Sequence, residues 1–292
     1  MMDEFLSSII SVLFYGVAYG MVLYVISVGL SITMGMMGVA NLAHGVFAMS
    51  GGYILVTALA KFHIPFPLAL ALAFFIVAFA SVFLDRLLYK HIYGSPELEQ
   101  VLFSIALIFI AIAIARIVFG TLQQPVLLPD YLKDQFTFLG RDFPAYRVFI
   151  IIFSSLLIGV LWFGVENTKW GAMVRATVDH REMAQSIGIN TKLLFSVTFA
   201  VGSGLAGLGG ALGAEIIAIQ PTYPLEQLVF FLIVVSVGGL GSLKGPFIAA
   251  LLIGVLDTAC KYWLPEFGAF FIYIVTIGIL LWRPMGLLGK RA

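Results

Sequence analysis

GMMGVANLAHGVFAMSGGY, residues 35–53, interrupts a chain made mostly of long apolar runs. The stretch carries five glycines together with Asn41 and His44, all poor choices for a helix that faces lipid. Inside a bilayer every backbone N–H and C=O group must be bonded, so a broken helix survives only where protein buries it or where it lines a wet cavity. The stretch therefore predicts a broken membrane helix. Its polar side chains indicate either a functional site or a bond that holds two helices together.

The setting of this stretch is a membrane. The chain has 292 residues, of which 61% are hydrophobic and 11% are charged, and its mean hydropathy is +1.08. Because a soluble domain carries about 25% charged residues, the composition indicates an integral membrane protein with several spans. The formal net charge of +1 argues against a nucleic-acid partner.

Apolar runs of about 20 residues, the length that crosses a hydrocarbon core of about 30 Å, mark the expected helices. The candidate segments are 8–34, 45–60, 66–84, 99–119, 146–164, 192–217, 226–240, 246–263 and 267–282. Several are short or broken by glycine, so we expect an all-α polytopic protein of about eight to ten transmembrane or re-entrant helices. We expect one membrane domain over residues 1–292. The N-terminal MMDEFLSSII is acidic and has no small-residue cleavage site, so the first segment should stay as a span.

Two longer polar segments lie between the apolar runs, at 120–145 and 165–191. With 165–191 in the cytoplasm, alternation of the spans puts ten of the sixteen Lys and Arg residues on that side. Cations near short loops favour the cytoplasm, so this orientation is preferred, with the N-terminus and 120–145 outside. One miscounted span would reverse the side of the N-terminus.

Residues 35–52 and 235–252 align at a constant offset. The identities are Gly38 with Gly238, Gly45 with Gly245 and Phe47 with Phe247, and His44 falls opposite Lys244. Paired interrupted segments in the two halves of a transporter often mark its pathway. A true internal repeat and a chance alignment of two glycine-rich segments are both compatible with so few identities.

The sequence lacks the patterns that catalysis needs. The glycine-rich stretch 239–245 has no Ser or Thr after Lys244, which a phosphate-binding loop requires. The four histidines are scattered singly, and Cys260 is the single cysteine, so neither a metalloprotease pair nor a cysteine metal site is present. We therefore expect no enzyme activity, no catalytic residue, no cofactor and no metal.

The segment 165–191 contains one candidate helix, WGAMVRATVDHREMAQSIGIN from Trp170 onward, with Gly188 positioned to end it. Its small or apolar positions are Ala172, Val174, Ala176, Met183, Ala184 and Ile187, and its charges are Arg175, Asp179, Arg181 and Glu182. Composition alone favours a helix that lies on the lipid headgroups. The alternative is a short helix that docks into a groove on a partner protein.

Four stretches together resemble one family. GMMGVANLAHGVFAMSGGY at 35–53, GAMVRATVDHREMAQSIGIN at 171–190, GGLGSLKGPFIAALLIG at 238–254 and RPMGLLGK at 283–290 are similar, in the expected order, to the permease subunits of branched-chain amino acid (LIV-type) ABC importers. The resemblance covers nearly the whole chain. It is closer to the first of the two permeases of such systems, whose broken segment reads Asn-x-Ala-His-Gly, matched here by Asn41, Ala43, His44 and Gly45.

The resemblance implies a multi-pass permease of the bacterial inner membrane without an ATPase of its own. Its partners would be a second, homologous permease (a distinct chain or a second copy), two cytoplasmic ATPase subunits, a periplasmic substrate-binding protein and membrane lipid. It would import branched-chain amino acids or related small carboxylates or amides, since relatives also carry urea, short amides and aromatic acids.

The same resemblance assigns roles to particular residues. Segment 171–188 would be the coupling helix that docks on the ATPases, with Gly171, Arg175, Ala176, Asp179, Ala184 and Gly188 as its characteristic positions. The residues expected to border the translocation path are Gly38, Asn41, His44, Gly45, Gly238 and Gly245. Packing of neighbouring helices remains the competing role for Asn41 and His44.

A self-contained secondary transporter or channel for a small polar solute is the alternative function. Such a protein usually needs an intramembrane carboxylate or ion-binding cage, and Asp257 is the best candidate. Lys261, four residues on, is positioned to neutralise it, which favours a structural ion pair. Glu215 and Glu226 flank the turn IAIQPTYPLE on the expected outer side, where a solvated loop and a docking surface for a binding protein are equally compatible.

Overall fold

The computed structural model describes residues 2–37, 41–92, 95–138 and 141–288. The elements are α1 Met2–Met37, α2 His44–Ala60, α3 Phe66–Leu87, η1 Tyr89–His91, α4 Glu97–Phe119, α5 Asp130–Lys133, β1 Gln135–Phe138, β2 Arg141–Pro144, α6 Ala145–Asn167, α7 Lys169–Asp179, α8 Arg181–Ser186, α9 Thr191–Gly213, α10 Tyr223–Gly238, α11 Lys244–Trp263 and α12 Gly268–Trp282. Each predicted apolar segment coincides with a helix, so the expectation of an all-α polytopic membrane protein is confirmed.

The apolar helices differ in length. Within the described residues, six are long and apolar enough to cross a membrane, namely α1, α3, α4, α6, α9 and α11. Helices α2, α10 and α12 are also apolar but have only 17, 16 and 15 residues. These lengths lie at or below the lower limit of about 17 residues for a span. Of these three short helices, α2 and α10 adjoin the two glycine-rich breaks that the sequence predicts.

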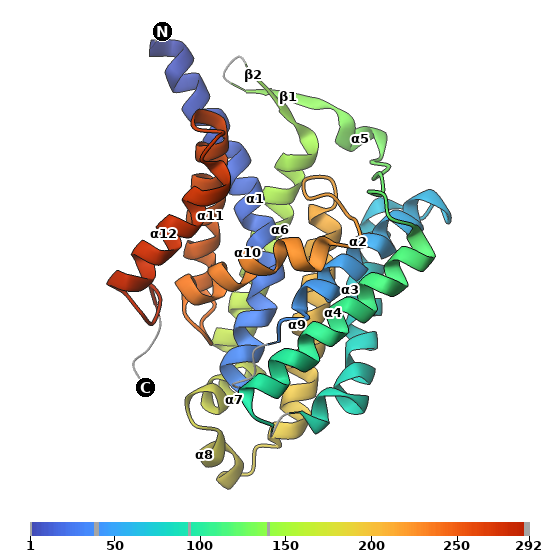
Figure 1. Cartoon of the computed structure of the whole chain (residues 1–292), viewed down its shortest axis with the longest axis vertical. Coiled ribbons are helices and arrows are strands. Elements are labelled where there is room, and N and C mark those ends of the chain that lie inside the picture. Colours follow the sequence, from blue (N-terminus) through green and yellow to red (C-terminus); the bar gives the residue numbers. More distant parts are fainter. Residues whose placement is uncertain (1, 38–40, 93–94, 139–140, 289–292) are drawn as a thin grey trace.

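Helices α1 and α9 form the core of the bundle. In α9, 72% of the apolar window is buried inside the chain, and in α1 61%, against 22% in both α4 and α6. Helix α1 packs against α9 and α11, and α9 also packs against α2 and α3 (Figure 1). The outward side chains of α4 are apolar, with Ile117 85% exposed. Lipid or a partner subunit must therefore cover the outer helices.

The sequence VGSGLAGLGGALG, residues 201–213, lets α9 approach its neighbours closely. Gly207 lies directly against Gly51 of α2, where a Cβ atom on Gly51 would overlap the Gly207 carbonyl group. Gly210 lies in the same way against Ala48, one turn away. In lipid, close van der Waals contact between small residues is a main force that joins helices. The helix that follows the first break is thus fixed to the core through glycine contacts.

The polar segment 120–145 contains more structure than the sequence predicts. After the short helix α5, strands β1 and β2 pair antiparallel, with Gln135 opposite Pro144. Thr137 Oγ1 donates a hydrogen bond to Asp142 Oδ1 at 2.6 Å across this hairpin. Strands of four residues are too short to give a readable alternation, which is why the sequence does not predict this hairpin.

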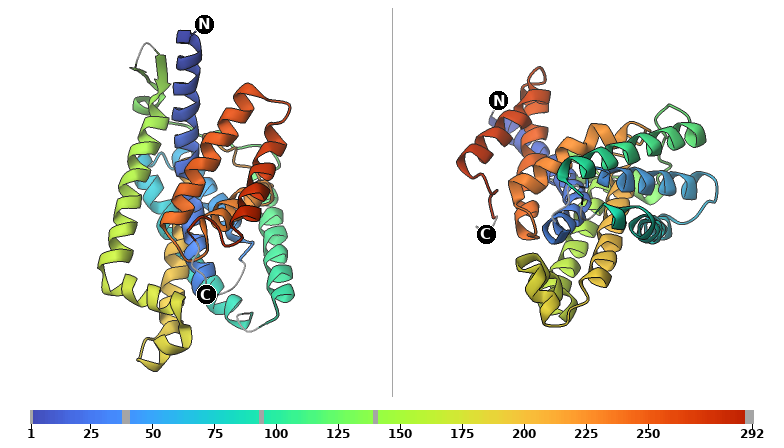
Figure 2. Two further views of the ribbon diagram at one scale, coloured as in Figure 1. Left: turned by 90° about the vertical axis from the view of Figure 1, so that its left-hand side faces the viewer. Right: turned by 60° about the horizontal axis from the view of Figure 1, so that its bottom comes forward.

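The bundle has two distinct ends. The start of α1 and the β1–β2 hairpin lie at one end, called here the hairpin end, and α7 and α8 lie at the other (Figures 1 and 2). Helix α6 runs toward α7, and α9 runs away from α8. This arrangement agrees with the alternation that the charge pattern predicts, in which the N-terminus and segment 165–191 lie on opposite sides of the membrane.

Candidate functional site

The first break separates α1, which ends at Met37, from α2, which begins at His44. Gly38, one of the expected path residues, falls in 38–40, outside the described residues. The His44 side chain is 2% exposed, and its Nε2 lies 2.8 Å from the carbonyl oxygen of Ile26 on α1. This hydrogen bond ties the first residue of α2 back to α1, the preceding helix.

Asn41 holds the break from the other side. It is 4% exposed, and its Oδ1 accepts hydrogen bonds from the backbone N–H of Ala43 at 3.1 Å and from the Tyr89 hydroxyl at 2.8 Å. Among the described residues its Nδ2 is buried without a hydrogen-bond partner. Leaving a buried donor unpaired costs about 1–3 kcal/mol. No described residue of the break therefore accepts a hydrogen bond from this amide.

An apolar cleft of about 770 Å³ adjoins this break, between α2, α3 and α4. Ala43 and Tyr89, the two residues that bond to Asn41, both line it. Asn41 and His44 themselves lie behind this lining. Asn41 thus bonds to two residues of the cleft wall, whereas His44 bonds to Ile26, which does not line the cleft.

The second break joins α10 to α11 and is built from glycines. Gly239 and Gly241 have φ values of 98° and 73°, a backbone conformation that only glycine adopts without strain. A Cβ atom on Gly238 would lie 2.6 Å from the carbonyl carbon of Gly245, so these two predicted residues are in contact. Any side chain at Gly238 would force the loop open.

This loop bonds to the end of α1. The Gly241 N–H donates to the Ser31 carbonyl oxygen at 3.1 Å, and the Ser31 hydroxyl donates to the Ser242 carbonyl oxygen at 3.1 Å. Gly241 also packs against Gly35, the first glycine of the opening stretch. The second break is therefore attached to the helix that precedes the first break.

The predicted path residues fall into two groups rather than one. A Cβ atom on Gly45 would lie 3.0 Å from Pro224 Cα, so the first break meets the start of α10. Gly238 lies at the other end of α10, roughly 21 Å away at 1.5 Å per residue. Both α2 and α11 begin at positions that the sequence alignment pairs, His44 and Lys244. Helix α10 thus connects the two breaks.

The segment predicted as one coupling helix over 171–188 is two helices. Helix α7 ends at Asp179, His180 adopts an extended conformation with φ −150° and ψ 95°, and α8 starts at Arg181. The Thr168 hydroxyl caps α7 by accepting from the Gly171 N–H at 3.1 Å. Gly188, at φ +92°, follows the end of α8, as expected for a glycine that stops a helix.

The predicted coupling residues point in different directions. Gly171 and Ala184 are buried in the chain, Ala176 is half-buried, and Arg175, Asp179 and Gly188 are exposed. The most exposed large apolar side chains of α8 and its end are Met183 at 66% and Ile187 at 70%. These two side chains lie four residues apart and so share one face. We name them the α8 patch.

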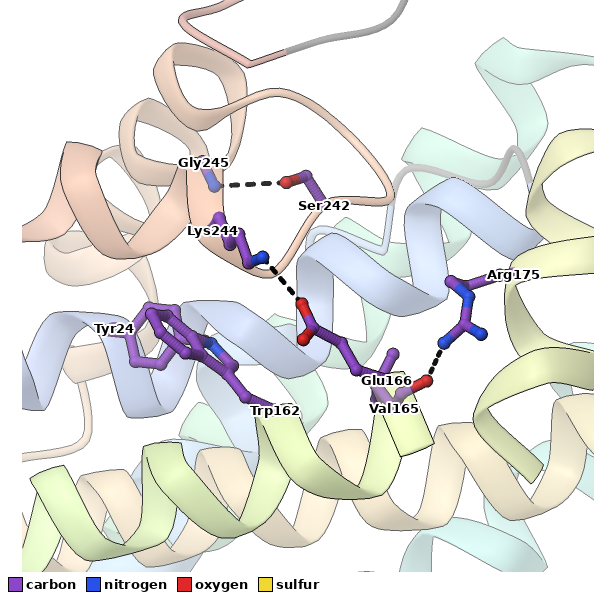
Figure 3. A network of polar contacts seen from close by, with 8 residues as sticks. All are labelled: Tyr24, Trp162, Val165, Glu166, Arg175, Ser242, Lys244 and Gly245. Atoms are coloured by element: carbon purple, nitrogen blue, oxygen red, sulfur yellow. Dashed lines mark hydrogen bonds and ion pairs between the residues drawn. The ribbon is translucent and has the colours of Figure 1, made fainter. Parts of the chain in front are cut away.

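Figure 3 shows how α7 connects to the second break. Lys244 Nζ, at the start of α11, lies 2.8 Å from Glu166 Oε1, at the end of α6. The Arg175 guanidinium turns back to donate to the Val165 carbonyl oxygen. A Cβ atom on Gly241 would lie 2.8 Å from Val178 of α7. Segment 165–178 therefore touches the loop between α10 and α11 directly.

Sequence reasoning missed Glu166 and Tyr89 as members of the site. Each pairs with a residue far along the chain, Lys244 and Asn41, and nothing in the local pattern identifies the partner. The one indication in the sequence was that both are polar residues at the ends of apolar segments.

Comparison with known proteins gives a match over residues 12–280 to the family described as branched-chain amino acid transport system / permease component. The high-affinity branched-chain amino acid transport system permease protein LivH of Salmonella typhimurium is 25% identical over 294 residues, covering 95% of this chain and 94% of LivH. BraD, a permease protein of the same description from Pseudomonas aeruginosa, is 26% identical over 292 residues and covers 94% of each chain. A probable LivH of Methanocaldococcus jannaschii is 27% identical, covering 94% of this chain and 90% of the relative. No solved structure matches the chain.

Proposed function

Because the chain belongs to the family of branched-chain amino acid transport system permease components, we propose that it is the membrane-spanning subunit of an ATP-driven importer of branched-chain amino acids or related small carboxylates and amides. The observation that carries this proposal is the family match, which extends over nearly the whole chain. The protein lies in the inner membrane as a multi-pass permease.

ATPase and substrate-binding partners follow from the family. We propose the specific assembly to be two cytoplasmic ATPase subunits, a second homologous permease subunit and a periplasmic binding protein. Segment 165–191 then lies in the cytoplasm, as its cations favour. Reconstitution tests the function: in proteoliposomes the chain alone should neither hydrolyse ATP nor concentrate leucine, whereas the full assembly should do both.

Movement of the ATPases would reach the helix breaks through two contacts. The first is the ion pair of Glu166 with Lys244, and the second is the packing of Val178 against Gly241. Both ion-pair side chains are about half exposed, at 50% and 57%, so the pair fixes register more than it adds stability. A shift of α7 would therefore displace the loop that contacts the end of α1. Such a coupling needs one element with two arrangements, and this junction is the candidate.

A self-contained secondary transporter finds less support. This alternative needs Asp257 as an unpaired intramembrane carboxylate, but Lys261 Nζ lies 2.6 Å from Asp257 Oδ2. A carboxylate already paired at this distance is poorly suited to bind a coupling ion.

The first break is proposed to border the translocation path. Its support is that Ala43 and Tyr89, which bond to Asn41, line the apolar cleft beside it. An aliphatic side chain fits such a lining. In this account Asn41 shapes the wall, and neither Asn41 nor His44 contacts the substrate.

Removing the Asn41 amide should lower transport without preventing assembly of the transporter. Asn41→Ala deletes two hydrogen bonds that hold the break, at about 0.5–1.5 kcal/mol each, so we expect uptake by the assembled transporter to fall by about tenfold. Tyr89→Phe deletes one of these bonds and should lower uptake by a few-fold. Both are measured as leucine uptake per assembled complex.

Tyr53→Phe is the matched control. Tyr53 lines the same cleft, and among the described residues its hydroxyl has no hydrogen-bond partner. Its loss should leave uptake nearly unchanged. Poor assembly of Asn41→Ala with normal uptake per complex would instead assign Asn41 to helix packing alone.

A further inference from the structure

A second hollow, of about 760 Å³, opens at the hairpin end of the bundle. It lies between α1, α6, α10, α11 and the loop that follows α9. Its walls carry charged side chains of both signs: Arg147, Lys261, Glu215, Glu226 and Asp257. This mixture differs from the apolar cleft beside the first break, so the hollow suits a different kind of contact.

Two of the carboxylates already have partners. Asp257, whose side chain is 3% exposed, is paired with Lys261 at 2.6 Å, because a carboxylate taken out of water needs a cation beside it. Both carboxylate oxygens of Glu226 accept from Gln220 Nε2 at 2.8 Å.

Arg147 and Glu215 have no ion-pair partner in the part of the chain that the structure describes. The Arg147 guanidinium is half-buried, 4.5 Å above the Tyr15 ring centre, and no described carboxylate lies within 4.0 Å of it. Glu215 is exposed at the mouth and likewise has no cation within 4.0 Å among the described residues. One unpaired charge of each sign therefore lines the same hollow, and the two do not neutralise each other.

A third group in the hollow also lacks a partner. Gln227 Oε1 is buried, and among the described residues no donor reaches it. This oxygen accepts hydrogen bonds and offers no charge. Among the described residues, the groups of the hollow without an ion-pair or hydrogen-bond partner are thus one guanidinium, one carboxylate and one amide oxygen, beside the apolar side chains of Ile216 and Ala218.

We propose that this hollow binds a free α-amino acid as a zwitterion. The planar guanidinium of Arg147 would take the α-carboxylate through two parallel hydrogen bonds. Glu215 would accept from the α-ammonium, Gln227 Oε1 would do so once its side chain turns from the buried position into the hollow, and the aliphatic side chain would lie on the apolar wall. The proposal rests on the proposed function, and it identifies the hollow as the place where the permease receives its substrate at the hairpin end.

The test uses the full chain in lipid nanodiscs and saturation-transfer NMR with three probes. L-leucine carries both charged groups, 4-methylpentanoate lacks the ammonium, and 3-methylbutylamine lacks the carboxylate. We expect L-leucine to give the strongest signal. Arg147→Gln and Glu215→Gln should each reduce that signal by about tenfold or more, the loss expected when at least one charge-assisted hydrogen bond is removed.

Arg116→Gln and Glu266→Gln serve as controls, because both residues are exposed and lie outside the hollow. They should leave the signal unchanged, and size-exclusion profiles of all four variants show whether they fold. Equal signals from wild type and both hollow variants, no signal from wild type, or equal signals from all three probes would overturn the proposal. If the assembled transporter still imports leucine while the hollow variants bind and transport normally, the inference fails and the proposed function stands. If the hollow variants bind the periplasmic substrate-binding protein more weakly while their leucine signal is unchanged, the hollow is a docking surface for that protein instead.

Discussion

Gly51→Val should abolish accumulation of folded permease. A Cβ atom at this position already overlaps the carbonyl group of Gly207, and the obstacle is helix backbone rather than a flexible side chain. Helices α2 and α9 would have to separate along their shared stripe, where Gly210 meets Ala48 one turn away. Overpacking in cores commonly costs about 1–3 kcal/mol, and here the separation also forfeits the close contacts that hold membrane helices together.

We expect the yield of monodisperse protein, measured by size-exclusion chromatography of a fluorescent fusion, to fall by about tenfold or more. Gly159→Val is the matched control. Gly159 lies on α6 with no atom within 4 Å of its added Cβ, so the yield should change by less than about twofold. Normal yield of Gly51→Val would show that α2 does not pack on α9 as described.

A double variant of the α8 patch, Met183→Glu with Ile187→Glu, should uncouple the transporter. These side chains are 66% and 70% exposed at the end of the molecule that carries the coupling segment. Burying one such side chain in a partner's groove is worth about 1.5–3 kcal/mol, so losing both weakens docking of the ATPases by about a hundredfold or more. Copurification of the ATPase subunits and ATP-driven uptake should both be lost.

Gln185→Glu is the control for this variant. It adds a carboxylate to the same short helix on the opposite face, because the exposed Gln185 is two residues from both Met183 and Ile187. It should retain the ATPases. Full copurification and uptake by the double variant would assign the segment to the lipid headgroups, the role that composition alone favours. Ala184, which the family resemblance places in the coupling helix, is unsuitable for such a test, because Ala184 is 2% exposed and a bulky residue there would disturb this chain itself.

Hydropathy was sufficient to predict the apolar helices, because an α-helix is the simplest structure that bonds its own backbone groups inside a bilayer. The same constraint made the first break readable, since Asn41 and His44 stand out in an apolar setting. Glycines likewise marked the second break, and the two residues that the alignment pairs, His44 and Lys244, are the first residues of α2 and α11. Gly188 was predictable as a helix end because glycine is the residue that most often follows a helix. Its φ of +92° is a conformation that favours glycine.

Other features depend on contacts that no local pattern encodes. The bond of Tyr89 to Asn41 and the ion pair of Glu166 with Lys244 join residues distant in sequence. The break of the coupling segment at His180 lies within a run of ordinary helix formers, so periodicity extended the helix across it. The outward or inward direction of Ala184 depends on how α8 packs on α9, which sequence periodicity over so short a helix does not fix.

The most direct test of the central claim is uptake of radiolabelled leucine into proteoliposomes. The purified chain alone, given ATP, a proton gradient or a sodium gradient, should not concentrate leucine. The same chain assembled with its permease partner, ATPase subunits and binding protein should accumulate leucine only when ATP is present on the ATPase side. Concentrative uptake by the chain alone, driven by either ion gradient, would contradict the account and identify the protein as a self-contained secondary transporter.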